Sequence, residues 1–422
     1  MSGQNQHAWG IAIARIAHEL GIVENNERVF TEYESPTHDE LSNLTKKVYQ
    51  IVSLIVSCPD RFHHGNLVQF ANAIGFSAQL TKLLLTFNES LTDDVFIRGD
   101  LIHEANDNWK LLEINVGTPI GGLIYASLPR LAGFSQHNDV LKSWAISIVK
   151  KYNIHGNVAF IEDQKYIEYV RRFVPIQARE IANLTGENAS ILSQNEVVLK
   201  ENGLYSKIDD SKIDFILPLF SDQDFFENFN TYNDILDACK QGCVKSVMGP
   251  INRIIASKGA LAYLYNLAES GFLTGIEKTL LETMVPYTTW LNPINIDQIK
   301  TSRTEWILKP SSGFCGKEVV IGLETTPLAW EAILESHCYN FPDKTYVVQR
   351  YVQNPSVGTV LTDKFGKIYN EQTKFIWGPF HIGSEYIGTF VRGNSFKSSA
   401  VINHFNGAEI GPIPYPNGVE TR

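Results

Sequence analysis

Several features that mark particular protein classes are scarce or missing from this sequence. Cysteine is rare: the five cysteines are scattered and odd in number, which favours reduced thiols in the cytoplasm over a disulfide framework. Cys239 and Cys243 lack a second pair of ligands, so we expect no zinc site. No apolar run approaches the roughly 18 residues of a membrane span, and the first residues show no basic segment followed by an apolar core. We therefore expect a cytoplasmic protein without a membrane partner.

Basic residues are fewer than acidic residues in this sequence. The 422 residues carry a net charge of −10, which argues against sequence-independent nucleic-acid binding because such binding needs a basic surface. Apolar residues make up 44% of the chain and charged residues 19%, which is the composition of an ordinary globular protein. The length suits roughly two or three domains. No repeat or low-complexity linker separates them, so we expect these domains to pack closely.

Two common catalytic motifs are missing as well. The sequence contains no G-x-x-x-x-G-K-[ST], so a Walker-type phosphate loop is excluded. It contains no G-x-S-x-G either, so we find no nucleophile elbow of a serine hydrolase. Chemistry, if present, must come from less common arrangements.

One such arrangement is a predicted strand, Trp306–Lys309, that ends in a lysine and leads into a Ser/Gly turn. Gly313 and Gly316 let the backbone approach a ligand closely and point N–H groups at it. Lys309, and Lys317 at the far end of the turn, add point charges that suit phosphate oxygens. The stretch predicts a nucleotide-phosphate clamp on a β-hairpin. An ordinary hairpin turn with solvated lysines is the alternative.

A second arrangement lies on two predicted strands around Arg98-Gly-Asp100 and Glu113-Ile-Asn115. Residues two apart on a strand share a face, so all four polar side chains converge if the strands pair through the turn at 106–108. Two carboxylates and an amide oxygen suit Mg²⁺ that bridges phosphates, and an adjacent arginine suits an anionic transition state. A hairpin with a surface ion pair is the alternative.

The regions of the chain differ in their periodicity. Residues 1–90 show helical spacing, so we expect 1–150 to be a helical region that also holds the predicted hairpin. Strand–helix–strand alternation predicts a small parallel-sheet α/β domain over 151–245. Strands dominate the end of 246–422, for which we expect a nucleotide-binding region with an antiparallel sheet. The fold class is thus α/β (α+β).

The order of these motifs resembles the circularly permuted branch of the ATP-grasp superfamily, which includes glutathionylspermidine synthetase and eukaryotic glutathione synthetase. In most ATP-grasp enzymes the metal-binding Glu-x-Asn follows the lysine loop, whereas here it precedes it. The run Leu112-Glu-Ile-Asn-Val-Gly-Thr-Pro119 is similar to the branch's Glu-Tyr-Asn-Ala-Asp-Thr-Pro. The Val-Gln-Arg-Tyr-Val strand after the lysine loop resembles the nucleotide site of the superfamily as a whole, and Asn252–Lys258 and Gly388–Arg392 resemble the branch.

The resemblance implies an ATP-dependent carboxylate–amine ligase with ATP and Mg²⁺ as cofactors. Such an enzyme forms an amide or peptide bond through an acyl phosphate and releases ADP and phosphate. Its partners would be small-molecule carboxylate and amine substrates, such as an amino acid, a peptide or a polyamine. A non-catalytic ATP-grasp-like binding or scaffold protein and a kinase-like phosphotransferase are the alternatives.

The resemblance also implies roles for single residues. Lys258 and Lys309 would hold the nucleotide phosphates, and Gln349 and Tyr351 would lie at the adenine. The loop that closes over the phosphates and excludes water would contain Ser312, Gly313, Gly316 and Lys317. Magnesium would be held by Asp100, Glu113 and Asn115. The catalytic residues would be Arg98 at the acyl phosphate, Lys317, and Arg392 at a substrate carboxylate or phosphate. The branch often has an acidic residue in this loop, and Ser311–Gly316 has none.

Overall fold

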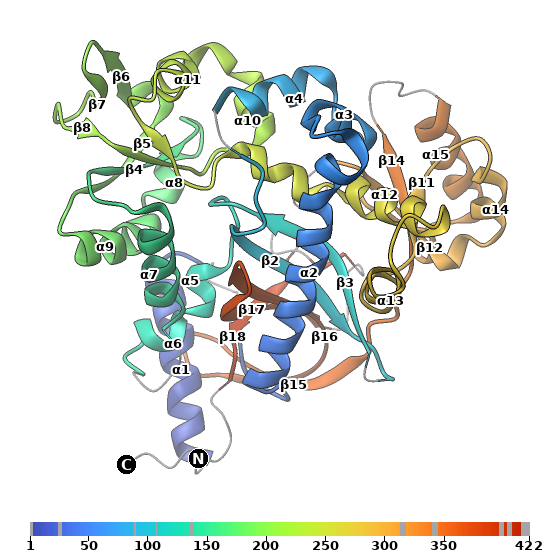
Figure 1. Ribbon diagram of the computed structural model, residues 1–422. Coiled ribbons are helices and arrows are strands. Elements are labelled where there is room, and N and C mark those ends of the chain that lie inside the picture. Colours follow the sequence, from blue (N-terminus) through green and yellow to red (C-terminus); the bar gives the residue numbers. More distant parts are fainter. Residues whose placement is uncertain are drawn as a thin grey trace.

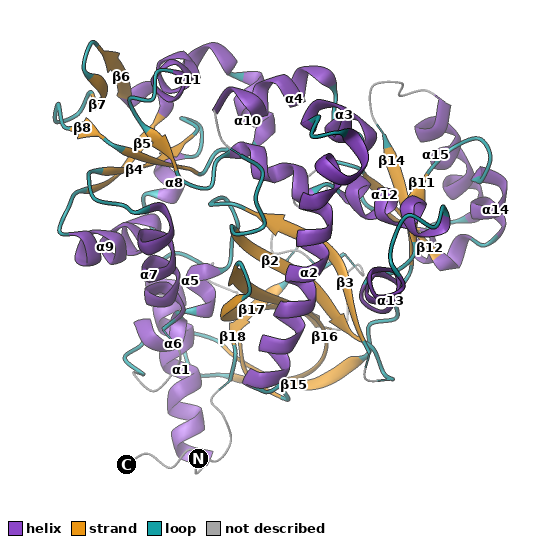
Figure 2. Ribbon diagram, viewed as in Figure 1, coloured by secondary structure: helices purple, strands orange, loops and turns teal. Residues whose placement is uncertain are grey.

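The computed structural model of the chain describes residues 3–23, 28–87, 90–106, 108–134, 139–312, 318–339, 345–395, 401–402 and 407–414. Helices surround a large sheet, a small parallel sheet and two small antiparallel sheets (Figure 1, Figure 2). The expected α/β fold class is therefore confirmed. In the described part of the chain, no helix is long and apolar enough to cross a membrane.

The N-terminal region is helical except for one strand. Its helices are α1 (Gly3–Glu19), α2 (His38–His63), α3 (Leu67–Ala73) and α4 (Ala78–Leu84). Helix α2 starts at a capping box in which Thr37 and Glu40 exchange hydrogen bonds. The strand is β1 (Val29–Tyr33), where we expected helix; its β-branched and aromatic residues favour an extended chain. The expectation of helix throughout this region is therefore wrong at β1.

The large sheet has seven strands in the order β15-β1-β18-β17-β16-β2-β3. Their bounds are β1 (Val29–Tyr33), β2 (Phe96–His103), β3 (Trp109–Val116), β15 (Ser356–Thr362), β16 (Ile368–Ile382), β17 (Glu385–Ser395) and β18 (Glu409–Pro412). The first strand of the chain thus sits between two of the last. Regions 1–150 and 246–422 share this sheet, so neither completes it alone.

The predicted hairpin of β2 and β3 is confirmed, and it contains a β-bulge. Arg98 pairs with Asn115 and Asp100 pairs with Glu113, but Leu101 then pairs with Leu111. Leu112 is therefore an extra residue on β3 that lies opposite the bond between Asp100 and Leu101 and has no partner of its own in the pairing. A bulge leaves the extra residue outside the ladder and re-aims side chains around it. This bulge adjoins the predicted polar cluster.

The region around 151–245 contains the expected parallel sheet. Its order is β10-β9-β4-β5, and all its neighbouring strands are parallel. Its strands are β4 (Val158–Glu162), β5 (Ala189–Ser193), β9 (Phe215–Pro218) and β10 (Lys245–Ser246). A small antiparallel sheet adds β6 (Val197–Lys200), β7 (Gly203–Ser206) and β8 (Lys212–Ile213). The helices in and before this region are α5 (Leu123–Ala126), α6 (Leu128–Leu131), α7 (Val140–Tyr152), α8 (Ile167–Val170), α9 (Val174–Thr185), α10 (Asp222–Glu227) and α11 (Asn233–Lys240).

The other small antiparallel sheet carries the predicted lysine strand. Its order is β11-β14-β12-β13, with β11 (Thr288–Trp290), β12 (Trp306–Pro310), β13 (Val320–Ile321) and β14 (Tyr346–Arg350). Its outer face packs on α14 (Ile296–Thr301) and α15 (Pro327–Tyr339) through residues such as Trp306, Leu308 and Trp330. Alternation along β12 therefore turns Lys309 to the inner face. Helices α12 (Lys258–Glu269) and α13 (Gly275–Met284) precede this sheet.

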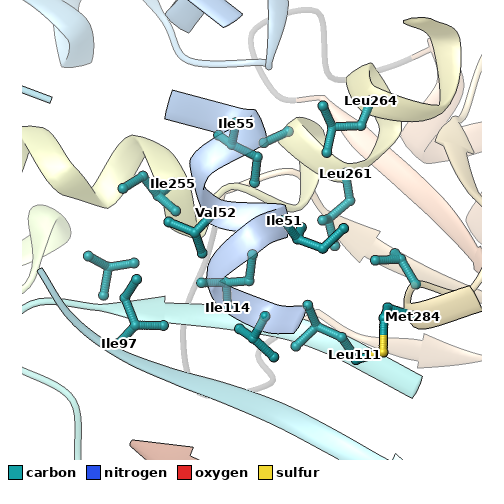
Figure 3. Close-up of a cluster of buried hydrophobic side chains, with 14 of the residues drawn as sticks. Ile51, Val52, Ile55, Ile97, Leu111, Ile114, Ile255, Leu261, Leu264 and Met284 are labelled. Atoms are coloured by element: carbon teal, nitrogen blue, oxygen red, sulfur yellow. The ribbon is translucent and has the colours of Figure 1, made fainter. Parts of the chain in front are cut away.

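The main hydrophobic core lies between α2 and the hairpin of β2 and β3 (Figure 3). Ile51 and Val52 of α2 are fully buried there, and Leu111 of β3 reaches the same cluster. Leu261 and Leu264 of α12 close the cluster on another side (Figure 3). This core fixes the hairpin against α12, whose first residue is one of the predicted lysines.

Acid should destabilise the protein through His381, which is fully buried on β16. Its Nδ1 donates to the Gly383 carbonyl at 2.6 Å, and burial lowers its pKa to about 4. The folded-state pKa is below the unfolded value of about 6.5, so the unfolded chain takes up the proton first and stability falls from about pH 6.5 towards pH 4. We expect a loss of about 2 kcal/mol in unfolding free energy between pH 7.5 and pH 5.

Urea unfolding at the two pH values measures this loss. The loss should shrink in His381→Gln and persist in His155→Gln, which changes an exposed histidine. An equal loss in all three proteins would show that His381 is not its source.

Candidate functional site

The candidate site lies where the inner face of the small antiparallel sheet meets β3. The Lys309 ammonium group donates to the Leu112 carbonyl at 3.4 Å, and the Gln349 amide lies 3.5 Å from the same oxygen. Leu112 is the bulged residue, so its carbonyl is available outside the strand ladder. Lys309 also donates to Gln349 Oε1 at 2.6 Å, and Gln349 Nε2 donates to Thr288 Oγ1 at 3.0 Å. Lys309 and Gln349, which were both predicted to contact the nucleotide, thus contact each other and β3.

Lys309 is a buried cation with only 6% of its surface exposed. Burial, together with the charge of Lys258, lowers its pKa by more than Glu113 and Asp100 raise it, and the resulting pKa is about 8. These charges act on Lys309 because all four groups lie close together. A buried ammonium group costs free energy unless it is paired, which makes it a strong attractor for a bound anion.

Lys258 joins the same cluster from the first position of α12. Its Nζ lies 3.3 Å from Glu113 Oε2, and the residue is 7% exposed. Its backbone N–H donates to the Ser311 carbonyl at 2.8 Å, and the Ser257 hydroxyl donates to the same oxygen at 3.1 Å. The start of α12 is therefore tied to the end of the lysine strand, directly before the predicted phosphate loop.

Arg98, Asp100 and Arg392 form a buried group on the same face of the large sheet. Arg98 Nε donates to Asp100 Oδ1 at 2.8 Å, and Arg392 Nη2 donates to Asp100 Oδ2. Burial would raise the pKa of Asp100, but the charges of Arg392 and Arg98 outweigh it and hold that pKa well below its usual range. Asp100 is therefore ionised over the physiological pH range.

Glu113 and Asn115 face the site from β3. The Glu113 side chain is 31% exposed, and Asn115 Nδ2 donates to the Arg98 carbonyl at 3.4 Å, so its amide oxygen lies outside that bond. A carboxylate and an amide oxygen fit a hard cation shared with phosphate oxygens. Asp100 fits such a cation poorly, because guanidinium groups already occupy both of its oxygens. Within the described residues, no three His, Cys, Asp or Glu side chains form a metal-binding group.

A cavity of about 420 Å³ opens beside the end of β14. Its volume falls in the usual range for small-ligand sites. It lies next to the predicted adenine contacts, and its lining includes Tyr351, Val352, Arg350, Tyr287, Tyr265 and Lys110. Tyr351 thus lies at a cavity, whereas Gln349 points back to Lys309.

The predicted phosphate loop is only partly described. Ser312 is the last residue before it that the structure places, and it is half-buried. Gly313, Gly316 and Lys317 lie outside the described residues, as does Cys315. Their roles stay predictions.

One polar cluster was missed from the sequence. Glu162, at the end of β4, is 7% exposed, and burial followed by Asp224 and Asp163 raises its pKa to about 7. It lies at the carboxyl edge of the parallel sheet, where ligands bind in many α/β folds. Nearby, Thr118 donates to the Pro218 carbonyl. The run Ile161-Glu-Asp was a signal in the sequence, because one acidic residue ends an otherwise apolar strand and a second follows it.

Gly259, the residue after Lys258, allows α3 to approach α12. A Cβ atom there would lie 2.2 Å from the Ile74 carbonyl oxygen and 2.5 Å from the Trp290 ring. Alanine normally stabilises a helix relative to glycine by up to about 1 kcal/mol. Here we expect Gly259→Ala to destabilise the protein by about 2 kcal/mol, because a backbone oxygen must move.

Urea unfolding of Gly259→Ala measures the change in unfolding free energy. Gly275→Ala in α13 is the matched control, since its Cβ would meet nothing within 4 Å. A stability gain in Gly259→Ala would mean that α3 and α12 are not in close contact.

The fold is shared with a solved structure at low sequence identity. The chain is similar to a glutathione synthetase-like effector from Globodera pallida in its apo form, with a TM-score of 0.59 and 10% identity, over 98% of this chain and 98% of that one. A putative γ-glutamylcysteine synthetase from Methylobacillus flagellatus matches 90% of this chain and 87% of that one, with a TM-score of 0.43 and 12% identity. Comparison with family models and with curated proteins finds no match. The first likeness shows a common fold over nearly the whole chain.

Proposed function

We propose that this protein is an ATP- and Mg²⁺-dependent ligase that joins a carboxylate to an amine through an acyl phosphate. The observation that carries the proposal is a convergence of four cationic side chains on two carboxylates. The group consists of Arg98, Lys258, Lys309, Arg392, Asp100 and Glu113. The four cations exceed the two carboxylates by two positive charges, although the net charge of the whole protein is −10. This local positive charge favours binding of a polyanion such as a nucleoside triphosphate.

The nucleotide would lie along the junction of the two sheets. Its adenine would occupy the cavity at Tyr351 beside the backbone of 350–352, and Gln349 would lie between base and phosphates. Lys309 and Lys258 would hold the phosphates. The loop of Ser312, Gly313, Gly316 and Lys317 would exclude water, which protects an acyl phosphate from hydrolysis.

Magnesium would be held by Glu113 and Asn115 together with phosphate oxygens, and it would neutralise charge on the phosphates. The remaining chemistry belongs to the chain itself. Lys258 and Lys309 would fix the transferring group, and Arg392 would stabilise the anion that forms. The resemblance also implies Asp100 as a metal ligand, but its hydrogen bonds to Arg98 and Arg392 favour a different role.

The amine would approach from the parallel sheet. The bond from Thr118 to Pro218 joins the segment after Asn115 to the carboxyl edge of that sheet. Arg253, which precedes Lys258 by five residues, donates to the Phe220 carbonyl at 2.6 Å. The edge of the parallel sheet and the cationic group are thus connected through short segments. This supports a substrate-side role for the 151–245 region.

Motif order supports the circularly permuted ATP-grasp branch, because the Glu-x-Asn of β3 precedes the lysine of β12. The four described cysteines, 58, 239, 243 and 338, are not joined in disulfide bonds, which fits the reducing cytoplasm. A non-catalytic nucleotide-binding protein is the second candidate. It is favoured by the stretch Ser311–Gly316, which contains no carboxylate.

Calorimetric titration with a non-hydrolysable ATP analogue, with and without Mg²⁺, tests the nucleotide site. Magnesium-dependent binding followed by release of ADP with a carboxylate–amine pair, and an amide product, would support the ligase. A stable phosphorylated product would favour a phosphotransferase. Binding without turnover on any tested pair would favour the second candidate, and no binding at all would refute the nucleotide site.

A further inference from the structure

We propose that Asp100 positions the pair Arg98 and Arg392 and is not a ligand of the divalent cation. The proposal deepens the proposed function and rests on it, because it assigns a role within the same site. The cation would then depend on Glu113 and Asn115 alone among the side chains of the hairpin.

The first reason is that both oxygens of Asp100 are already bonded. Oδ1 accepts from Arg98 Nε at 2.8 Å, and Oδ2 accepts from Arg98 Nη2 at 3.4 Å and from Arg392 Nη2. The residue is only 3% exposed. A cation at Oδ2 would have to displace a guanidinium group, and a cation at Oδ1, which accepts from Arg98 Nε, would lie beside that guanidinium group. Lost hydrogen bonds in the first case and charge repulsion in both cases oppose binding.

The second reason is that the fold makes room for this arrangement. Arg98 on β2 and Arg392 on β17 are separated by β16, yet both reach Asp100. The residue of β16 beneath the Arg98 side chain is Gly378, where a Cβ atom would lie 2.8 Å from Arg98 Cδ and 3.2 Å from Cγ. A larger residue would push the guanidinium off Asp100. The glycine thus permits Arg98 to lie across the neighbouring strand.

The two arginines are held to different degrees. Arg98 also donates from Nη1 to the Gly121 carbonyl at 2.6 Å, so each of its three nitrogens makes a hydrogen bond. Arg392 uses Nη2 on Asp100 and is 13% exposed at its side chain. Both guanidinium groups lie 5.8 Å from the centre of the Phe390 ring. Arg392 is therefore the member of the pair that presents donors to an anion, while Arg98 and Asp100 orient it.

Glu113 is the one neighbour that complicates this assignment. It is paired with Asp100 across the hairpin, so the two carboxylates are neighbours on adjacent strands. Two adjacent carboxylates are also the arrangement that a divalent cation bridges. If Asp100 is a metal ligand, removing its charge should weaken binding of the cation; if it positions the arginines, the affinity for the cation should change little.

The test compares Mn²⁺ affinity in four proteins saturated with a non-hydrolysable ATP analogue. These are the unsubstituted protein, Asp100→Asn, Glu113→Gln and the double variant Asp100→Asn with Arg98→Gln. We expect the Mn²⁺ dissociation constant to change less than about 3-fold in Asp100→Asn, and to rise at least about 10-fold in Glu113→Gln. The double variant removes one charge of each sign, so it keeps the local balance if the single variant fails to fold.

Turnover adds a readout that a structural defect alone would not give. Asp100→Asn should lower kcat about 100-fold without raising the Mg²⁺ concentration needed for half-maximal rate. Gly378→Ala should do the same because it displaces Arg98. Gly358→Ala is its control in the same sheet, where a Cβ would meet only Gln372 Nε2 at 3.7 Å.

A loss of Mn²⁺ affinity in Asp100→Asn and in the double variant that matches Glu113→Gln would overturn the proposal. Full kcat in Asp100→Asn would overturn it as well. Absence of Mn²⁺ and analogue binding in the unsubstituted protein would instead refute the proposed function, so the two failures are distinguishable.

Discussion

Lys309→Met should weaken binding of an ATP analogue about 100-fold while leaving the protein at least as stable as before. A charged hydrogen bond to a phosphate contributes up to about 3 kcal/mol, and Lys309 is a buried cation at the junction of the two sheets. Methionine fills a similar volume without a charge. The variant therefore separates two effects that usually fall together, ligand affinity and stability.

The stability gain follows from the sign of the pKa shift. Burial lowers the pKa of Lys309 to about 8, below the unfolded value of about 10.4. The folded state is therefore penalised below pH 8, by up to about 3 kcal/mol, and the penalty is relieved as the pH rises from 8 to 10.4. Urea unfolding at pH 7 should show Lys309→Met to be as stable as the parent or more so, and its stability should lack the parent's rise above pH 8.

Lys278→Met, an exposed lysine of α13, is the matched control and should alter neither quantity. Unchanged affinity for the analogue in Lys309→Met would remove Lys309 from the nucleotide site. A marked loss of stability would mean that its bonds to Gln349 and Leu112 outweigh the cost of burial.

Glu113→Gln should lower ligase turnover about 1,000-fold and abolish the effect of Mg²⁺ on analogue binding. Glutamine keeps the shape of the side chain but loses the charge that a hard cation requires. Glu113 is 31% exposed, so its neutralisation should leave the fold intact. Circular dichroism checks the fold, and titration of the analogue at several Mg²⁺ concentrations checks the metal dependence.

Glu385→Gln, an exposed position at the start of β17 in the same sheet, serves as the control. Magnesium-dependent binding that survives in Glu113→Gln would sink the assignment of the cation to β3. Loss of analogue binding even without Mg²⁺ would point to Lys258, which Glu113 contacts.

Local sequence was sufficient to predict the β2–β3 hairpin, and the start of α2 is equally local. The pairings of Arg98 with Asn115 and of Asp100 with Glu113 follow from two short strands, a polar turn and the rule that residues two apart share a face. The capping box at Thr37 depends on residues three apart. Interactions between residues that are close in the sequence can be predicted from the sequence pattern.

Contacts between distant segments were not predictable in the same way. Arg392 meets Asp100 across 292 positions, and only the order of strands in the sheet brings them together. The bulge at Leu112 leaves no mark in the pattern of apolar residues, although it supplies the carbonyl that Lys309 contacts. The close approach at Gly259 is equally hidden, because a glycine in a helix does not reveal what lies beside it.

The position of β1 between β15 and β18 has a consequence for how the chain folds during synthesis. Tyr33 and its neighbours leave the ribosome early but find their sheet partners, such as Thr359, only when most of the chain has been made. Because such pairings are far apart in sequence, folding of this sheet should be slow and should come late. Until then the hairpin that holds Asp100 lacks Arg392, so a nascent chain would keep β1 unpaired and open to chaperones.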